Sequence, residues 1–358
     1  MHLPFCAARC GYCAFVVEVG ALGRRDAYLD ALLVEFERES HRLAPLETVY
    51  LGGGTPTLMR GRRLTRLLAA IRPHLAPGAE VTLEANPETV ERALLDDLVA
   101  AGMTRISMGV QSLRPHVLGA LDRLATPDQA VRAVSCARAA GVGSVSIDML
   151  LAVPGQSAAD LADDLAGVCA MDPDHVSWYE LEIKPETALS RMGVEPLDED
   201  AAADAFRGTV AALEDAGYRW YETANFARPG HECRHSLAYW GAADYVGLGV
   251  GAVSTVGGAR WRNAGGLDPY IAALAGGGSP RRTHESLDGD TRRRERWMLG
   301  LRLDRPLAIG WAGPPDHPDA LDRLARWGLI ERDARTVTLT REGRFLQNAV
   351  LQELMEYA

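Results

Sequence analysis

The sequence has no long apolar run and no excess of positive charge. No window approaches the roughly 18 consecutive apolar residues of a membrane-spanning helix, and no basic segment precedes an apolar one at the N-terminus, so we expect neither a transmembrane segment nor a signal peptide. The 358 residues carry 38 Lys and Arg against 48 Asp and Glu, a net charge of −10. Since phosphate contacts need excess basic residues, we expect no nucleic-acid partner. We therefore predict a cytoplasmic protein, for which transient association with a membrane surface stays open.

Cysteines are also few, and their positions are uneven. Six cysteines in 358 residues are too few for a disulfide scaffold in a cytoplasmic chain of this size. Cys6, Cys10 and Cys13 crowd the first 13 residues, whereas the other three are scattered. A hydrophobic content of 47% and a charged content of 24% are typical of a globular protein and exclude long disorder.

Short apolar segments alternate with longer helical patterns through the N-terminal half. Apolar residues spaced by three and four predict helices between the strands. Alternating strands and helices predict a parallel sheet with helices outside, either a barrel or a doubly wound fold. The predicted strands are 48–51, 81–85, 105–110, 145–151 and 176–183, and the predicted helices are 26–43, 62–75, 90–101, 127–140 and 158–171.

The C-terminal region has another organisation. A Gly-rich stretch covers 245–258, and the Gly/Ser/Pro stretch at 276–280 is typical of a linker. The helices predicted beyond it at 291–303 and 319–327, with a strand at 336–340 and a last helix from 341, resemble a winged-helix module. The acidic chain argues against DNA binding, so we expect a packing or lid role.

The three N-terminal cysteines have the spacing C-x3-C-x2-C. A structural zinc site normally shows paired C-x2-C units, and a bacterial ferredoxin shows C-x2-C-x2-C-x3-C followed by proline. Neither pattern fits. Three thiolates on one loop can bind three irons of a [4Fe–4S] cluster and leave the fourth iron open for a small molecule.

With Tyr12 before the last cysteine, this triplet resembles the signature of radical S-adenosylmethionine (SAM) enzymes. The flanking His-Leu-Pro-Phe and Ala-Phe resemble the branch that contains haem chaperones and oxygen-independent coproporphyrinogen III oxidases. Further matches to this branch are Gly52-Gly53-Gly54-Thr55-Pro56-Thr57, Glu84-Ala85-Asn86-Pro87, Gly109-Val110-Gln111-Ser112, Asp148 with Pro154-Gly155-Gln156, Tyr221-Glu222-Thr223-Ala224-Asn225-Phe226, Met298-Leu299-Gly300-Leu301-Arg302 and Leu339-Thr340-Arg341-Glu342-Gly343.

The resemblance implies an α/β fold, a partial (β/α)6 radical SAM barrel with a small C-terminal winged-helix-like α+β domain. We predict the barrel with its N-terminal cluster loop at 1–190, a barrel extension with a haem-binding segment at 191–280, and the C-terminal domain at 281–358. Relatives place the first barrel strand before His2, so we expect this strand to be almost absent unless the chain starts further upstream.

The resemblance also implies roles for single residues. Cys6, Cys10 and Cys13 would bind the [4Fe–4S] cluster, and the amine and carboxylate of SAM would bind the fourth iron. Arg123, expected in the helical stretch after Gln111, could pair with the SAM carboxylate. Taken singly, each of the residues expected to contact SAM fits a structural role equally well. Their joint match to the family favours contact with SAM. The residues expected to contact SAM are Tyr12, Gly53, Gly54, Thr55, Glu84, Gln111, Arg123 and Asp148.

Residues 233–240 resemble the haem-chaperone stretch H-N-x-x-Y-W. His235 would be the candidate ligand of haem iron, and Tyr239 and Trp240 would pack against the macrocycle. Ser236 replaces the usual Asn, and Cys233 is an additional candidate ligand.

The last two cysteines, Cys136 and Cys169, lie in helical patterns, and we expect both to be core thiols.

One position separates the two activities of the branch. The coproporphyrinogen oxidases carry a fourth cysteine where this chain has Phe15. We therefore predict a haem chaperone that binds haem and passes it to apo-haem proteins. The alternative is an oxygen-independent coproporphyrinogen III oxidase that uses a SAM-derived radical. A winged-helix regulator that senses redox state or haem is disfavoured by the charge balance.

Overall fold

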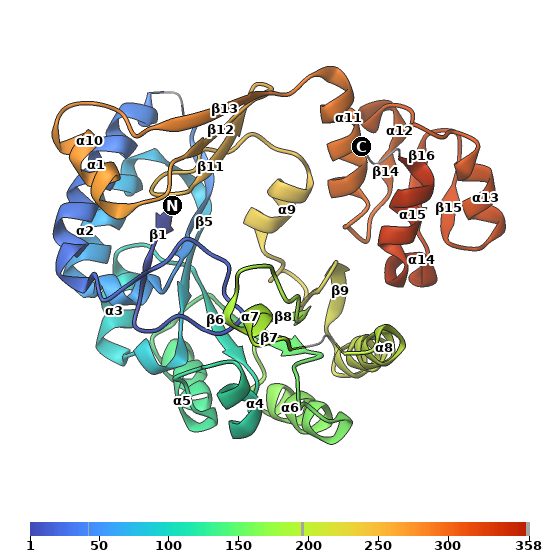
Figure 1. Ribbon diagram of the computed structural model, residues 1–358, viewed down its shortest axis with the longest axis horizontal. Helices are drawn as coiled ribbons and strands as arrows, with labels where there is room; N and C mark the ends of the chain where they lie inside the picture. The colour runs from blue at the N-terminus through green and yellow to red at the C-terminus, as the bar shows by residue number, and fades with distance from the viewer. Residues whose placement is uncertain (42, 195–196, 356–358) are drawn as a thin grey trace.

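A curved sheet with six parallel strands forms the centre of the molecule (Figure 1). The computed structural model describes residues 1–41, 43–194 and 197–355; residue 42, inside the predicted helix 26–43, lies outside them. Strands β1 to β8 of this sheet run parallel, the next strand runs antiparallel to them, and the last strand is antiparallel to that one and so points the same way as the first six. In sheet order the strands are β1 (His2–Leu3), β4 (Leu46–Gly53), β5 (Leu75–Ala85), β6 (Arg105–Gln111), β7 (Ser144–Leu151), β8 (His175–Glu180), β10 (Asn225–Ala227) and β9 (Arg219–Glu222).

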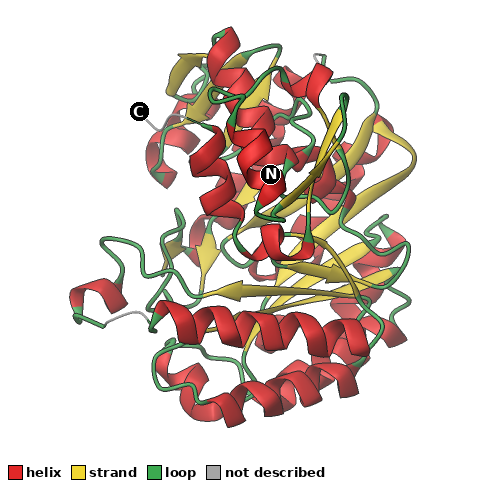
Figure 2. Cartoon of the chain, turned by 90° about the vertical axis from the view of Figure 1, so that its right-hand side faces the viewer, coloured by secondary structure: helices red, strands yellow, loops and turns green. Residues whose placement is uncertain are grey.

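Helices follow the parallel strands and cover the outer face of the sheet (Figures 1 and 2). The predicted alternation is confirmed, and of the two folds it allowed the structure has the partial (β/α)6 barrel. Capping boxes start α5 and α6, in which Thr126 and Ser157 accept from the backbone three residues later. The helices of this part are α1 (Arg25–Ser40), α2 (Gly61–Ile71), α3 (Arg92–Ala100), α4 (Pro115–Ala120), α5 (Pro127–Ala139), α6 (Ala158–Met171), α7 (Ala188–Arg191) and α8 (Glu199–Asp215).

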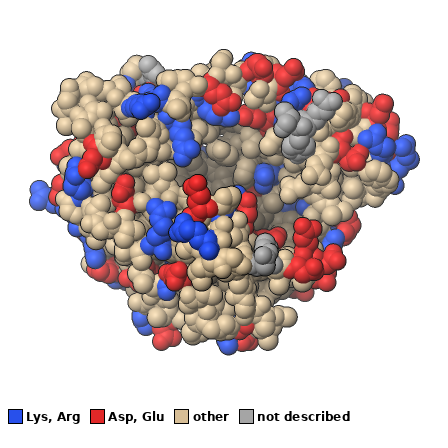
Figure 3. Space-filling view, viewed as in Figure 1, with Lys and Arg blue, Asp and Glu red and all other residues tan. Residues whose placement is uncertain are grey.

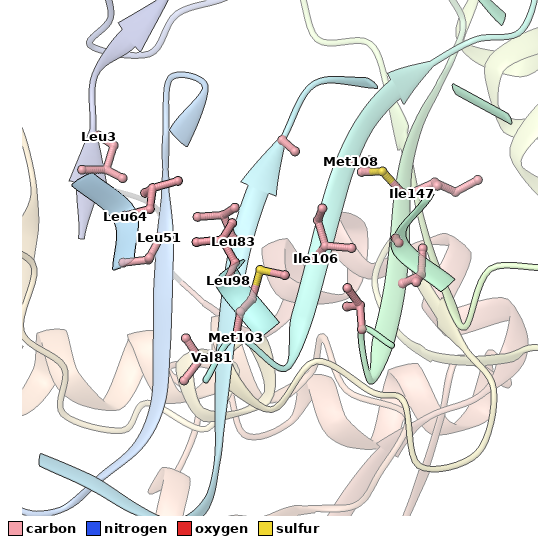
Figure 4. Packing of buried hydrophobic residues seen from close by; sticks show 14 of the residues in the cluster. Leu3, Leu51, Leu64, Val81, Leu83, Leu98, Met103, Ile106, Met108 and Ile147 are labelled. Carbon is pink, nitrogen blue, oxygen red and sulfur yellow. The ribbon is translucent and has the colours of Figure 1, made fainter. Parts of the chain in front are cut away.

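Alternate residues of the strands face the outer helices and the inside of the barrel. One set is apolar and packs under the helices, as Leu51, Leu83 and Ile106 show (Figure 4). Because successive side chains of a strand point to opposite faces, the residues between them face the inside of the barrel. Many of these are polar, which makes the interior a place for ligands. They include Thr48, Tyr50, Thr82, Glu84, Arg105, Ser107, Asp148 and Ser177.

The first strand is short, as expected. Strand β1 has two residues, His2 and Leu3, which pair with Gly52 and Gly53 of β4. The segment that carries the three cysteines follows at once: Cys6 ends β2 (Phe5–Cys6), and the other two lie in the loop before β3 (Glu18–Val19), which pairs with β2 in parallel.

Some predicted boundaries and placements are wrong. Helix α2 ends at Ile71 rather than at residue 75, because Pro73 has no N–H to continue the hydrogen bonds of the helix, and Arg72–His74 form a short 3-10 turn instead. Strand β5 then begins at Leu75, six residues before the predicted start, and β8 ends at Glu180 rather than at 183.

Two single-residue expectations are also corrected. Cys169 on α6 is exposed, because the buried face of this helix contains Asp164 and Val168, and the next residue lies about 100° further round. Cys136 is half-buried against the core. Arg123 lies in the loop after α4 and not in a helix, since Asp122 takes a left-handed backbone conformation there.

The remaining chain forms two smaller sheets. A second hydrophobic core around Trp297, Leu324 and Val350 holds the C-terminal unit, which has the predicted helix, strand-pair and helix order. The predicted domain boundary at 280 stays a prediction, and β13 just beyond it pairs with β12. The elements are α9 (Arg234–Trp240), β11 (Val253–Val256), β12 (Ala259–Asn263), α10 (Leu267–Ala275), β13 (Arg282–Ser286), α11 (Gly289–Gly300), β14 (Leu307–Ala308), α12 (Ile309–Ala312), α13 (Ala320–Arg326), β15 (Ile330–Arg332), β16 (Thr336–Leu339), α14 (Arg341–Phe345) and α15 (Gln347–Leu354).

The C-terminal unit contacts the edge of the barrel at β9. The Arg344 guanidinium lies 3.6 Å from the ring centroid of Trp220, and the ring of Phe345 lies 5.0 Å from the same indole. The backbone N–H of Thr223 donates to the carbonyl of Arg302 at 2.9 Å. The face seen in Figure 3 is hollowed between this unit and the barrel. Within the described ranges, no helix is long and apolar enough to cross a bilayer.

Candidate functional site

The cysteine loop lies over the carboxyl end of the barrel. The backbone of Gly11 bonds to Leu121 at 3.1 Å and to Leu189 at 3.0 Å, which ties the loop to segments far along the chain. Cys6, Cys10 and Cys13 are free thiols that are half-buried. Burial raises the pKa of Cys6 and that of Cys13.

The three cysteines and all eight residues expected to contact SAM line one cavity of about 700 Å³, called the cluster cavity below. Glu84 and Gln111 lie at the ends of β5 and β6, and Asp148 lies within β7, so each is in a strand as predicted. The turn after β4 supplies Gly53 and Gly54. Residues from six separate segments therefore meet at the carboxyl end of the barrel.

Arg123 connects the cysteine loop to the floor of the cluster cavity. Its guanidinium donates to Cys10 Sγ at 3.5 Å and to Asn86 Oδ1 at 3.0 Å, and it also bonds to the carbonyl of Gly109. Its Nε is buried and has no hydrogen-bond partner among the described residues. A buried guanidinium with an unsatisfied donor suits a carboxylate ligand.

Glu84 joins the glycine turn to the interior of the barrel. Its Oε2 accepts from the backbone N–H of Gly53 at 2.9 Å, and its Oε1 accepts from the hydroxyl of Tyr50 at 2.8 Å. Burial raises the pKa of Glu84. A cationic ligand in the cluster cavity would therefore stabilise the ionised form of this carboxyl.

Asp148 is the second carboxyl of the cluster cavity, and like Glu84 it is half-buried. Ser107 donates to its Oδ1 at 3.0 Å, and burial raises its pKa above the usual range. Together with Tyr12 and Gln111, Asp148 also lines a larger cavity of about 1200 Å³ deeper in the barrel, called the inner cavity below. The two cavities therefore adjoin.

The donor set fits an iron–sulfur cluster and SAM. Among the described residues, no group of three or more His, Cys, Asp or Glu side chains could hold a single metal ion. A cluster of several irons does not need this convergence, because each cysteine bonds to a different iron. The unsatisfied Arg123 Nε and the half-buried carboxyl of Glu84 suit the carboxylate and the ammonium of SAM respectively.

Three further cavity residues were not predicted as SAM contacts. Asn86 donates to Thr55 Oγ1 at 3.2 Å and accepts from Arg123, and Ser107 bonds to Asp148. A Cβ atom at Gly109 would lie 2.9 Å from Gln111 Nε2, so a side chain at this position would displace the amide of Gln111. Asn86 and Gly109 stand in the motifs that carried the resemblance, whereas nothing in the sequence singles out Ser107.

The predicted haem segment forms helix α9, which closes the amino-terminal half of the barrel. The carboxylate of Glu80 on β5 accepts from the backbone N–H groups of Arg234 at 3.1 Å and His235 at 3.0 Å. Figure 1 shows α9 between the sheet and the C-terminal unit. The cysteine loop lies at the opposite, carboxyl end of the strands, so the two predicted sites occupy opposite ends of the barrel.

The imidazole of His235 is held from two sides. Thr48 Oγ1 lies 2.9 Å from its Nδ1, and the ring of Tyr50 stacks on it with centroids 5.1 Å apart. A metal would therefore bind through Nε2, the arrangement in which histidine ligands usually occur. Burial lowers the pKa of His235 to about 4, which keeps the ring neutral near pH 7.

His235 lines a cavity of about 1490 Å³, called the α9 cavity below. Its walls are largely apolar, with Phe36, Leu46 and Val246 among them, and Arg234 adds a cation. A large apolar cavity with one imidazole and a few polar groups has the character of a cofactor site.

Tyr239, Trp240 and Cys233 do not line the α9 cavity. Tyr239 lines a separate cavity of about 710 Å³, and the indole of Trp240 packs under Arg302 at 4.9 Å. Cys233 is buried and faces the inner cavity, with its Sγ 3.7 Å from Glu80 Oε1. Cys233 and His235 thus line different cavities.

Comparisons with known proteins agree with this geometry. The model of the radical SAM superfamily matches residues 1–166. The protein named "Heme chaperone HemW" from Mycobacterium tuberculosis is 38% identical, with 99% of this chain and 94% of that protein aligned. The protein of the same name from Bacillus subtilis is 30% identical, over 98% and 97% of the two chains.

A solved structure shows the same fold over nearly the whole chain. The coproporphyrinogen III oxidase HemN from Escherichia coli, described as a radical SAM enzyme, superposes with a TM-score of 0.86 at 25% identity. The match covers 99% of this chain and 88% of that one.

A partial parallel barrel whose carboxyl end is covered by a three-cysteine loop defines a radical SAM protein. That superfamily implies a [4Fe–4S] cluster and SAM. Within this superfamily, the HemW proteins align with this chain over nearly its full length at 30% and 38% identity. The chain therefore belongs to the HemW family.

Proposed function

We propose that this protein is a haem chaperone, which binds haem and transfers it to apo-haem proteins. The observation that carries the proposal is the setting of His235, an imidazole oriented by Thr48 in the wall of a largely apolar cavity. The relatives that carry the name heme chaperone align along the whole chain. Three thiols that must stay reduced to bind iron suit the cytoplasm.

We assign the cofactor sites to the cluster cavity. Cys6, Cys10 and Cys13 would bind a [4Fe–4S] cluster, with Arg123 oriented towards the carboxylate of SAM. Such a cluster binds SAM at its fourth iron and can supply one electron to it. The protein would bind and orient SAM and keep water out of the cavity. The remaining SAM contacts would be those of Tyr12, Gly53, Gly54, Thr55, Glu84, Gln111 and Asp148.

The haem would lie along α9. His235 would bind its iron through Nε2, and Arg234 could pair with a propionate at the rim of the α9 cavity. Tyr239 follows His235 by one helical turn and extends the same side of α9. Trp240 would support this end of the site through its contact with Arg302.

The cluster is tested by anaerobic reconstitution, with iron and sulfide analysis and EPR. We expect one [4Fe–4S] cluster, which is lost in Cys10→Ala. Cys169→Ala, which removes an exposed thiol of α6, is the matched control and should keep the cluster. An intact cluster in Cys10→Ala contradicts the assignment.

The function is tested by haem titration beside an anaerobic assay for decarboxylation of coproporphyrinogen III. We expect stoichiometric haem binding that is lost in His235→Ala and kept in His284→Ala, which alters an exposed histidine of β13. Turnover to protoporphyrinogen without stable haem binding would instead favour the oxidase, whose fold the chain shares.

A further inference from the structure

Tyr50 on β4 lies between the SAM side of the barrel and the candidate haem ligand. It lines both the inner cavity and the α9 cavity. Its hydroxyl donates to Glu84, while its ring stacks on His235 at an interplanar angle of 24°. One half-buried side chain therefore contacts a carboxyl of the cluster cavity and the imidazole of the α9 cavity.

We propose that Tyr50 is a positioning residue through which SAM bound at one end of the barrel strengthens haem binding at His235 on the other. This inference rests on the proposed function, since it needs both ligands. From the sequence alone, Tyr50 is an ordinary residue of a predicted strand.

The physical basis is the charge state of Glu84. SAM carries an ammonium and a sulfonium, and either cation near Glu84 favours the ionised carboxylate. A hydrogen bond to an ionised acceptor is shorter and roughly twice as strong as one between neutral groups. SAM would therefore hold the Tyr50 hydroxyl more firmly and restrict the ring of Tyr50.

The restricted ring in turn positions the imidazole. Thr48 contacts Nδ1 of His235, and Tyr50 packs against the face of the imidazole. A fixed Tyr50 ring therefore restricts the rotation of the imidazole before iron binds. Pre-organisation of a ligand raises affinity by reducing the entropic cost of binding. The expected sign is thus positive: SAM tightens haem binding, and haem tightens SAM binding by the same factor.

The experiment compares haem titrations of the reconstituted protein with and without SAM, followed by absorbance and by EPR of the ferric haem. In the unaltered protein we expect SAM to tighten haem binding by roughly fivefold or more and to narrow the EPR signal. Tyr50→Phe keeps the ring but removes the hydroxyl. This variant should still bind the cluster, SAM and haem, yet show less than about a twofold response to SAM.

Tyr179→Phe is the matched control. Tyr179 lines the same inner cavity but stands on β8, four strands away from β4 in the sheet. This variant should respond to SAM as the unaltered protein does. An undiminished response in Tyr50→Phe overturns the proposal, and so does haem binding through His235 that SAM leaves unchanged or weakens.

The same measurements separate this inference from the function on which it rests. If His235→Ala binds haem as the unaltered protein does, the haem site and the role of Tyr50 both fail. If His235→Ala loses haem while SAM has no effect on the unaltered protein, the site stands and only the role of Tyr50 fails.

Discussion

Replacing Glu80 by alanine should release the start of α9 from the barrel. The buried carboxylate of Glu80 accepts from two backbone N–H groups, those of Arg234 and His235, at 3.1 and 3.0 Å. Hydrogen bonds to a charged group contribute about 1.5–3 kcal/mol each, and loss of a helix N-cap costs about 0.5–2 kcal/mol. Because these contributions overlap, we expect α9 to be destabilised by roughly 2–4 kcal/mol.

Amide hydrogen exchange of α9 measures this loss directly. Since 1.4 kcal/mol is a factor of ten, amides of α9 should exchange about 30- to 800-fold faster in Glu80→Ala. Haem affinity should also fall, because His235 stands in the first turn of α9, which Glu80 no longer holds. Glu80→Gln keeps one acceptor oxygen and should show an intermediate effect.

Glu47→Ala is the matched control, because Glu47 also faces Arg234 but is exposed and 4.0 Å away. Such a surface pair contributes about 0–1 kcal/mol, so its loss should barely change exchange. Unchanged exchange of α9 in Glu80→Ala would refute the reasoning, since it would mean that the carboxylate does not hold the helix.

Three further predictions concern two residues of the cluster cavity and the buried carboxyl of Glu222. Arg123→Lys should weaken SAM binding at least about tenfold by calorimetry, because lysine cannot replace the planar fork on Asn86 and Cys10; equal affinity would contradict this role. Gly109→Ala should weaken SAM binding without loss of iron, and a normal affinity would show that this wall has room. Burial raises the pKa of Glu222 from 4.5 to about 8, so the folded state holds a proton that the unfolded state releases. Stability should therefore fall between pH 5 and 8, by on the order of 1.4 kcal/mol per pH unit, and Glu222→Gln should reduce this slope in urea unfolding; an identical slope would refute the assignment.

The sequence predicted most of the barrel because its signals are local. Strands β6 and β7 alternate residues such as Ile106 and Met108 with polar ones, and the cysteine triplet lies within eight residues. The roles of some polar strand residues could not be predicted from the sequence in this way. Glu80 and Thr48 look like ordinary strand residues until α9, more than 150 residues later, returns to contact them.

Other features depended on contacts that no local pattern contains. The pairing of β13 with β12 carries the chain past the predicted linker before the C-terminal unit begins. Arg123 reaches the cysteines from a loop because a single residue, Asp122, takes a left-handed conformation. Tertiary contacts determine the first feature and one backbone conformation determines the second, so the periodicity of the sequence could not predict either.

The layout of β4 bears on the choice between chaperone and oxidase. One strand carries Thr48 beside His235, then Tyr50, and finally Gly53 beside the cluster cavity. Five residues at about 3.3 Å each separate the first from the last by roughly 16 Å. Radical abstraction of hydrogen needs the reacting atoms in contact, whereas an iron bound at His235 would lie about this far from the cluster cavity. Haem at α9 would therefore be cargo rather than substrate, and the influence of SAM on it would have to pass through residues such as Tyr50.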